Sequence, residues 1–164
     1  MIQHSLKIPV NDYQLQMLTV MLGPAPYKAN YRTAWGKIIL SSYSERKLTL
    51  RKKSNSDKYY EIILPTRWIE RNGIYFISDE SIEDFIEAID CRFKLELYTY
   101  IDGVLDFKEI YNKAAKVPIV AKMKDAACRF LDKKGMNEDL LKFETIKKGY
   151  QRYKQNYKCV GRVA

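Results

Sequence analysis

Hydrophobic residues along the chain keep one spacing over a segment and then change to another, so each change marks the start of a new element. The first helical segment follows Asn11 and Asp12, two residue types that cap helices, and continues to Leu22. The dipeptide Gly23-Pro24 comes next, and it is a typical signal for the end of a helix. We therefore expect the first helix of the chain to occupy this segment.

The spacing then changes from helical to alternating. Apolar positions between Tyr31 and Tyr43 recur at helical intervals, with Asn30 as the expected N-cap. Apolar and other residues instead alternate in 48–51 and in 60–64, which is the period of a strand, and the polar residues 54–57 separate the two segments. We interpret this region as a second helix followed by a β-hairpin with a basic tip.

The most strongly patterned helix is expected after a short third strand at 74–77. Ser78 or Asp79 can cap this helix, and acidic residues crowd its first turns, where the helix dipole favours negative charge. Its apolar positions are Ile82, Phe85, Ile86, Ile89, Phe93, Leu97 and Tyr100. The dipeptide Asp102-Gly103 is expected to end it, and a separate helix is expected over 107–117.

The C-terminal region has the outline of a helix-turn-helix. A helix over 121–133 precedes a turn at 134–136, a short helix capped by Asn137, and a basic helix from Glu144 to Lys158. Apolar side chains of the last helix follow one another at spacings of 3, 4, 3 and 4 and form a seam of Phe143, Ile146, Tyr150, Tyr153 and Tyr157. This unbroken seam also fits a single straight helix over 137–158, so both arrangements stay open.

Together these segments predict a predominantly helical α+β protein. N-terminal helices and a small antiparallel β-hairpin or three-stranded sheet form a unit over residues 1–105, and a helix-turn-helix-like unit follows over residues 106–164. A length of 164 residues with 46% hydrophobic residues allows a core without disulfides or metals. The chain has no long apolar run and no secretory signal, so we expect a cytoplasmic protein without a membrane partner.

Charge is segregated along the chain. The net charge is +9: residues 27–58 carry nine basic and two acidic side chains, residues 79–106 carry two basic and nine acidic, and residues 107–164 carry fifteen basic and six acidic. Two basic surfaces can bind an outside polyanion, or the acidic and basic helices can pair within the chain or between subunits. Solvated helix faces are the simplest alternative.

The basic helix supplies most of the candidate nucleic-acid ligands. Gln151 and Arg152 are residue types that contact base edges, whereas lysines mainly meet phosphates. Lys154 is expected with them on the side of the helix away from the seam. The full set of candidate binding residues is Lys147, Lys148, Gln151, Arg152, Lys154 and Lys158 of the helix, and Arg51, Lys52 and Lys53 of the hairpin.

The same residues fit other functions. Lysines beside a hairpin can protect a sheet edge from pairing, and Tyr150, Tyr153 and Tyr157 can pack in a core, form a homo-oligomer interface or stack on unpaired bases. Three hypotheses follow. The chain is a regulatory or accessory protein that binds nucleic acid, with double-stranded DNA preferred; or an assembly protein whose acidic and basic helices form subunit interfaces; or a metal-dependent nuclease that uses the carboxylates of 79–90.

No catalytic or cofactor signature is present in the sequence. His4 is the single histidine, so acid-base, Ser/His and zinc arrangements lack members, and the seven glycines form no phosphate-binding loop. Cys91, Cys128 and Cys159 have no ligand or redox spacing, and we expect them to be free thiols. We therefore expect no enzymatic activity, no metal and no cofactor.

Overall fold

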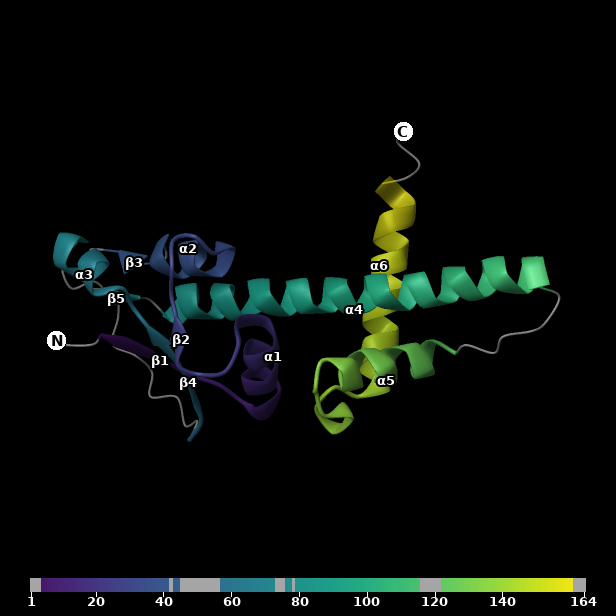
Figure 1. The fold of residues 1–164 in the computed structure, drawn as a ribbon, viewed down its shortest axis with the longest axis horizontal. Coiled ribbons are helices and arrows are strands. Elements are labelled where there is room, and N and C mark those ends of the chain that lie inside the picture. Colours follow the sequence, from purple (N-terminus) through teal and green to yellow (C-terminus); the bar gives the residue numbers. More distant parts are fainter. Residues whose placement is uncertain are drawn as a thin grey trace. The chain divides into compact units, whose positions relative to one another are not determined.

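The computed structural model describes residues 4–41, 43–44, 57–72, 76–77, 79–115 and 122–160. Within them the protein has six α-helices and a small three-stranded sheet of mixed direction, which confirms the expected predominantly helical α+β class (Figure 1). The chain forms two compact units, Met1–Cys91 and Arg92–Ala164, and α4 (Asp79–Ala115) contributes residues to both. The sequence pattern places this division later, after residue 105.

The sheet of the first unit joins segments that are far apart in the sequence. Its strand order is β1-β4-β2, with β1 antiparallel and β2 parallel to the central strand β4. A separate antiparallel pair is formed by β3 and β5. The elements that precede α4 are β1 (Ser5–Pro9), α1 (Asp12–Leu22), β2 (Tyr27–Lys28), α2 (Ala34–Ser41), β3 (Tyr43–Ser44), β4 (Tyr59–Ile63), α3 (Thr66–Asn72) and β5 (Phe76–Ile77).

Strand β1 is not among the elements expected from the sequence. Leu6 and Ile8 are buried, whereas Ser5 and Lys7 are exposed, which is the period of a strand with one face in the core. The alternation spans only five residues, which is a weak strand signal. This segment therefore becomes a strand because it pairs with the distant strand β4. The local sequence does not indicate that β4 is its partner.

Strand β4 is the second arm of the expected hairpin. The first arm, 48–51, and the turn residues 54–56 lie outside the described residues. Among those described, β4 is bonded to β1 and β2. Tyr60 of β4 is fully buried and its Oη donates a hydrogen bond to the carbonyl oxygen of Gly23 at 2.7 Å, which attaches the strand to the end of α1. Burial raises the pKa of Tyr60 to about 12.

The caps of the first two helices show how local chemistry sets their bounds. In α1, the Asn11 side chain accepts a hydrogen bond from the Gln14 backbone while the Gln14 side chain accepts one from the Asn11 backbone, as expected for a cap at Asn11. The prediction that Asn30 caps α2 is wrong. The side chain of Asn30 closes a turn by accepting from Arg32, and Thr33 Oγ1 accepts from Gly36 at 3.0 Å and caps the shorter helix.

The second unit consists of the C-terminal part of α4, α5 (Met123–Lys133), the 3-10 helix η1 (Glu138–Leu140) and α6 (Phe143–Val160). The expected end of α4 at Asp102-Gly103 is wrong, because the helix continues to Ala115. A glycine inside a helix costs only about 1 kcal/mol relative to alanine. The helix therefore passes through Gly103 at a small cost, although its fully buried residues Phe93, Leu97 and Ile101 all precede this position.

The core of the second unit lies where α4, α5 and α6 meet. Phe93 of α4 and Phe130 of α5 are buried with ring centroids 5.7 Å apart, and Leu131 of α5 and Ile146 of α6 are buried as well. This core lies on the N-terminal side of Gly103. Beyond Gly103, Phe107 and Ile110 of α4 are 62% and 68% exposed.

A single substitution tests the continuity of α4. Gly103 is exposed, and a Cβ added to it would meet nothing within 4 Å. If α4 is continuous, Gly103→Ala should raise the free energy of unfolding by about 0.5–1 kcal/mol, because alanine loses less backbone entropy in a helix. Urea unfolding followed by circular dichroism measures the change. A loss of stability would instead indicate a turn at this position.

Candidate nucleic-acid interface

The helix-turn-helix outline of the C-terminal region is confirmed. Helix α5 ends at Lys133, and Gly135 adopts φ +66°, a left-handed conformation that glycine tolerates at the end of a helix. Asn137 then caps η1, with its side chain accepting from the Asp139 backbone at 2.9 Å. The backbone leaves the helical region at Leu141, whose side chain is buried, so α6 is a separate helix and the single straight helix is not formed.

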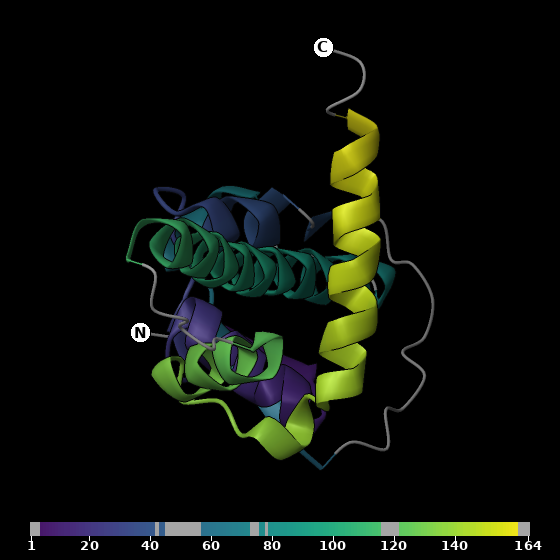
Figure 2. The ribbon, with the colours of Figure 1, turned by 90° about the vertical axis from the view of Figure 1, so that its right-hand side faces the viewer.

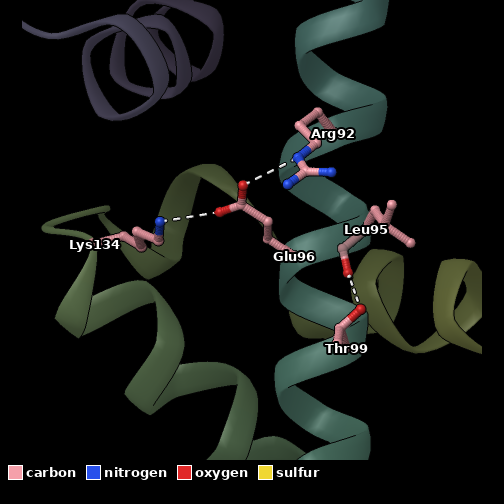
Figure 3. A network of polar contacts seen from close by, with 5 residues as sticks. All are labelled: Arg92, Leu95, Glu96, Thr99 and Lys134. Carbon is pink, nitrogen blue, oxygen red and sulfur yellow. Dashed lines mark hydrogen bonds and ion pairs between the residues drawn. The ribbon is translucent and has the colours of Figure 1, made fainter.

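The turn between α5 and η1 is attached to α4 by a charged network. Glu96 of α4 accepts hydrogen bonds from Arg92 Nε at 3.3 Å and from Lys134 Nζ at 3.1 Å (Figure 3). Lys134 Nζ also lies 5.6 Å from the centroid of the Phe130 ring. Because Lys134 makes these contacts within the unit, we assign it to the stabilisation of the turn and not to a binding surface.

The seam of α6 packs against α4 within the second unit. Ile146 is buried, and the half-buried rings of Tyr150 and Tyr153 lie 6.0 and 5.4 Å from the ring of the buried Tyr98 of α4. In Figure 1, α6 runs across α4 rather than along it. Tyr150 and Tyr153 of the seam therefore pack inside the helical unit, which is one of the uses expected from the sequence. The side chain of Tyr157 lies outside the described residues.

Gly149 allows the two helices to approach closely. A Cβ at this position would lie 2.0 Å from the hydroxyl oxygen of Tyr98 and 3.0 Å from its Cζ. Any larger residue must displace either the Tyr98 ring or α6 itself. The sequence pattern does not predict this role of Gly149, because the role depends on the ring of Tyr98, which lies on another helix.

Asp102 of α4 holds two side chains of α6. Its Oδ1 accepts a hydrogen bond from Tyr150 Oη at 2.5 Å and pairs with Lys154 Nζ at 2.7 Å, and Lys154 Nζ lies 5.7 Å from the centroid of the Tyr150 ring. Burial and the hydrogen bond to Asp102 raise the pKa of Tyr150 above its usual value. The same carboxylate raises the pKa of Lys154. In Figure 2, α6 begins beside α5 and continues past α4 towards the C-terminus.

The structure corrects the expected side for Lys154. This lysine faces α4 and pairs with Asp102, so it does not lie on the side away from the seam. Its sequence position gives the reason: it follows Tyr150 by one helical turn, which puts both side chains on the same face.

The outer face of α6 brings four of the predicted site residues together. Lys147, Lys148, Gln151 and Arg152 are all exposed. The exposed neighbours on the same helix are Thr145, Gln155 and Asn156, and Glu144 is the only acid of α6. We call Lys147, Lys148, Gln151 and Arg152 the outer basic face.

The side chains of four other predicted site residues lie outside the part of the chain that the structure describes. Lys158 belongs to α6, but its side chain lies outside the described residues. The hairpin residues Arg51, Lys52 and Lys53 also lie outside them.

Across the described ranges, no three His, Cys, Asp or Glu side chains are arranged to hold a metal ion. In the same ranges, no helix combines the length and the apolar composition needed to cross a membrane.

Comparison of the chain with protein-family models, curated proteins and solved structures gave no match.

The close approach at Gly149 can be tested by two substitutions. Gly149→Ala should lower the free energy of unfolding by roughly 1–3 kcal/mol, because the new methyl group overlaps the Tyr98 hydroxyl. Removing that hydroxyl with Tyr98→Phe should recover part of the loss in the double variant, which a double-mutant cycle measures in urea. A cycle without coupling would contradict the contact, and Gly103→Ala serves as the control for adding a methyl group elsewhere on a helix.

The Asp102 cluster predicts a loss of stability at alkaline pH. The pKa values of Tyr150 and Lys154 are raised in the folded state, so folding favours their protonated forms. This stabilisation is fully present below the unfolded pKa values, about 10, and is lost as pH rises through the folded values. In Tyr150→Phe the alkaline loss measured by urea unfolding should be smaller than in the wild type.

The control for this experiment is Tyr59→Phe. Tyr59 is 50% exposed, so its removal should leave the alkaline loss unchanged. Equal alkaline losses in wild-type and Tyr150→Phe protein would show that the cluster does not carry the effect.

Proposed function

We propose that the protein binds duplex nucleic acid, with DNA preferred, through the outer basic face of α6, and that it acts as a regulatory or accessory factor rather than an enzyme. The supporting observation is the division of α6 into two faces. One face packs on Tyr98 and Asp102 of α4, and the other exposes Lys147, Lys148 and Arg152. Three exposed cations with one acid on the same helix attract a polyanion.

The residue types on this face match the two parts of duplex recognition. Lys147 and Lys148 can neutralise phosphates, which positions a protein without reading sequence. Gln151 and Arg152 can form paired hydrogen bonds with base edges, and a major groove about 12 Å wide admits an α-helix. Gln155 lies one turn beyond Gln151 and extends the polar stripe along the helix.

The rigid attachment of α6 supports binding by a helix that keeps its position. The pairs formed by Asp102 with Tyr150 and Lys154 act together with the close approach of Gly149 to Tyr98. They hold the outer basic face in one orientation relative to the C-terminal part of α4. A binding surface that is already ordered loses less conformational entropy when a ligand binds.

The packing of the tyrosines favours a duplex over a single strand. Proteins that bind unpaired bases stack them on exposed aromatic rings. Tyr98, Tyr150 and Tyr153 are instead packed against one another, with the Tyr150 and Tyr153 rings stacked 6.3 Å apart. These rings are therefore occupied within the second unit.

The salt dependence of binding tests the proposal. The logarithm of the association constant for a duplex should fall linearly with the logarithm of salt concentration, by about 0.9 per neutralised phosphate. The variant Lys147→Gln/Lys148→Gln/Arg152→Gln should reduce this slope by about two to three. Fluorescence anisotropy with labelled duplex DNA, duplex RNA and single-stranded DNA measures the slopes and shows which ligand is preferred.

The matched control removes three exposed cations from the first unit. Lys28, Lys37 and Arg67 are exposed in β2, α2 and α3, and their substitution by glutamine makes the same change in net charge. This control should keep the wild-type slope. Equal slopes for the two triple variants would mean that total charge rather than α6 drives binding, and no duplex binding at low salt would rule out the proposal.

A further inference from the structure

The first unit contains an acidic groove between α1 and the N-terminal part of α4. Its volume is about 280 Å³. Ile86 supplies apolar surface, and Tyr13 supplies an aromatic ring. Glu83, Glu87 and Asp90 line the same groove, and none of the described residues that line it is basic. We call this feature the acidic groove.

The carboxylates of the acidic groove differ in their availability. Asp90 Oδ1 accepts a hydrogen bond from Tyr13 Oη at 2.6 Å, which ties α4 to α1. Glu83 and Glu87 are exposed and lie one helical turn apart on α4. Apolar surface beside two exposed carboxylates suits lysine and arginine, whose stems are apolar and whose heads are charged. An arginine can also stack on a tyrosine ring.

The chain itself carries the complementary surface. Lys148 and Arg152 of the outer basic face are exposed and also lie four residues apart on a helix, as Glu83 and Glu87 do. Each pair therefore spans about 6 Å along its helix axis. Two helices laid side by side can place both cations opposite both carboxylates.

We propose that the acidic groove of one copy of the chain binds the outer basic face of α6 from a second copy. Lys148 and Arg152 pair with Glu83 and Glu87, and the lysine and arginine stems lie against Ile86. Exchange of α6 in both directions closes a dimer, whereas exchange in one direction gives a head-to-tail series. This association does not depend on nucleic-acid binding, but it covers the same face, so a polyanion and a second copy compete for α6.

A charge exchange tests this association. Analytical ultracentrifugation at low salt should show reversible self-association of the wild type that weakens as salt rises. Glu83→Arg/Glu87→Arg and Lys148→Glu/Arg152→Glu should each weaken it by about tenfold or more, since like charges then face each other. An equimolar mixture of the two variants should associate again, because opposite charges meet in the mixed pair.

The control Glu70→Arg makes a charge reversal at an exposed position of α3, outside the acidic groove, and should leave association unchanged. Circular dichroism of each variant checks that the helices are intact. A wild type that stays monomeric up to ~1 mM at low salt would overturn the proposal. So would equal association of wild type and both variants, or a mixture that fails to associate.

The same variants separate this inference from the proposed function. Glu83→Arg/Glu87→Arg keeps α6 intact, so its affinity for duplex DNA should equal that of the wild type or exceed it under conditions where the wild type associates. Duplex DNA added to the associated wild type should release monomers bound to DNA. Association without any DNA binding would leave this inference standing while the proposed function failed.

Discussion

The close packing of Tyr98 against Gly149 fixes the place of α6 within the second unit. Because a hydrogen atom at Gly149 leaves room for the ring, α6 can cross α4 at a distance that brings Tyr150 and Lys154 to Asp102. Those contacts turn the seam inward and leave the opposite face exposed. The rotation of α6 about its own axis, and with it the set of side chains offered to a partner, depends on this close approach together with the contacts of Asp102.

Sequence signals predicted the elements whose bounds are set by neighbouring residues. Asn11 and Asn137 act as caps, and the helix-turn-helix outline follows from the break near Gly135. The pattern failed where distant packing decides the outcome. Asp102-Gly103 resembles a turn locally, yet Asp102 lies within α4 and binds Tyr150 and Lys154 of α6, and β1 becomes a strand only because β4 lies beside it.

The candidate site shows the same limit. Helical spacing placed Lys147, Lys148, Gln151 and Arg152 on an outer face, and these residues are exposed. The spacing from Tyr150 could also have assigned Lys154 to the inner side of α6. Its partner Asp102 lies on another helix, so the sequence around Lys154 does not indicate this pair. Charge segregation was visible throughout the sequence. Which basic residues are used inside the unit became apparent only from their three-dimensional contacts.

The strand order of the first unit has a consequence for how the chain folds. The central strand β4 is the last of its sheet in sequence, and about fifty residues separate Pro9 from its partner Tyr59. During synthesis β1 and β2 therefore emerge before the strand that joins them, and their backbone groups stay unpaired until β4 appears. Long-range closure of this kind is slow compared with helix formation. On a ribosome, α1 can form early, but the sheet on which the first unit depends is completed only after residue 63 has left the exit tunnel.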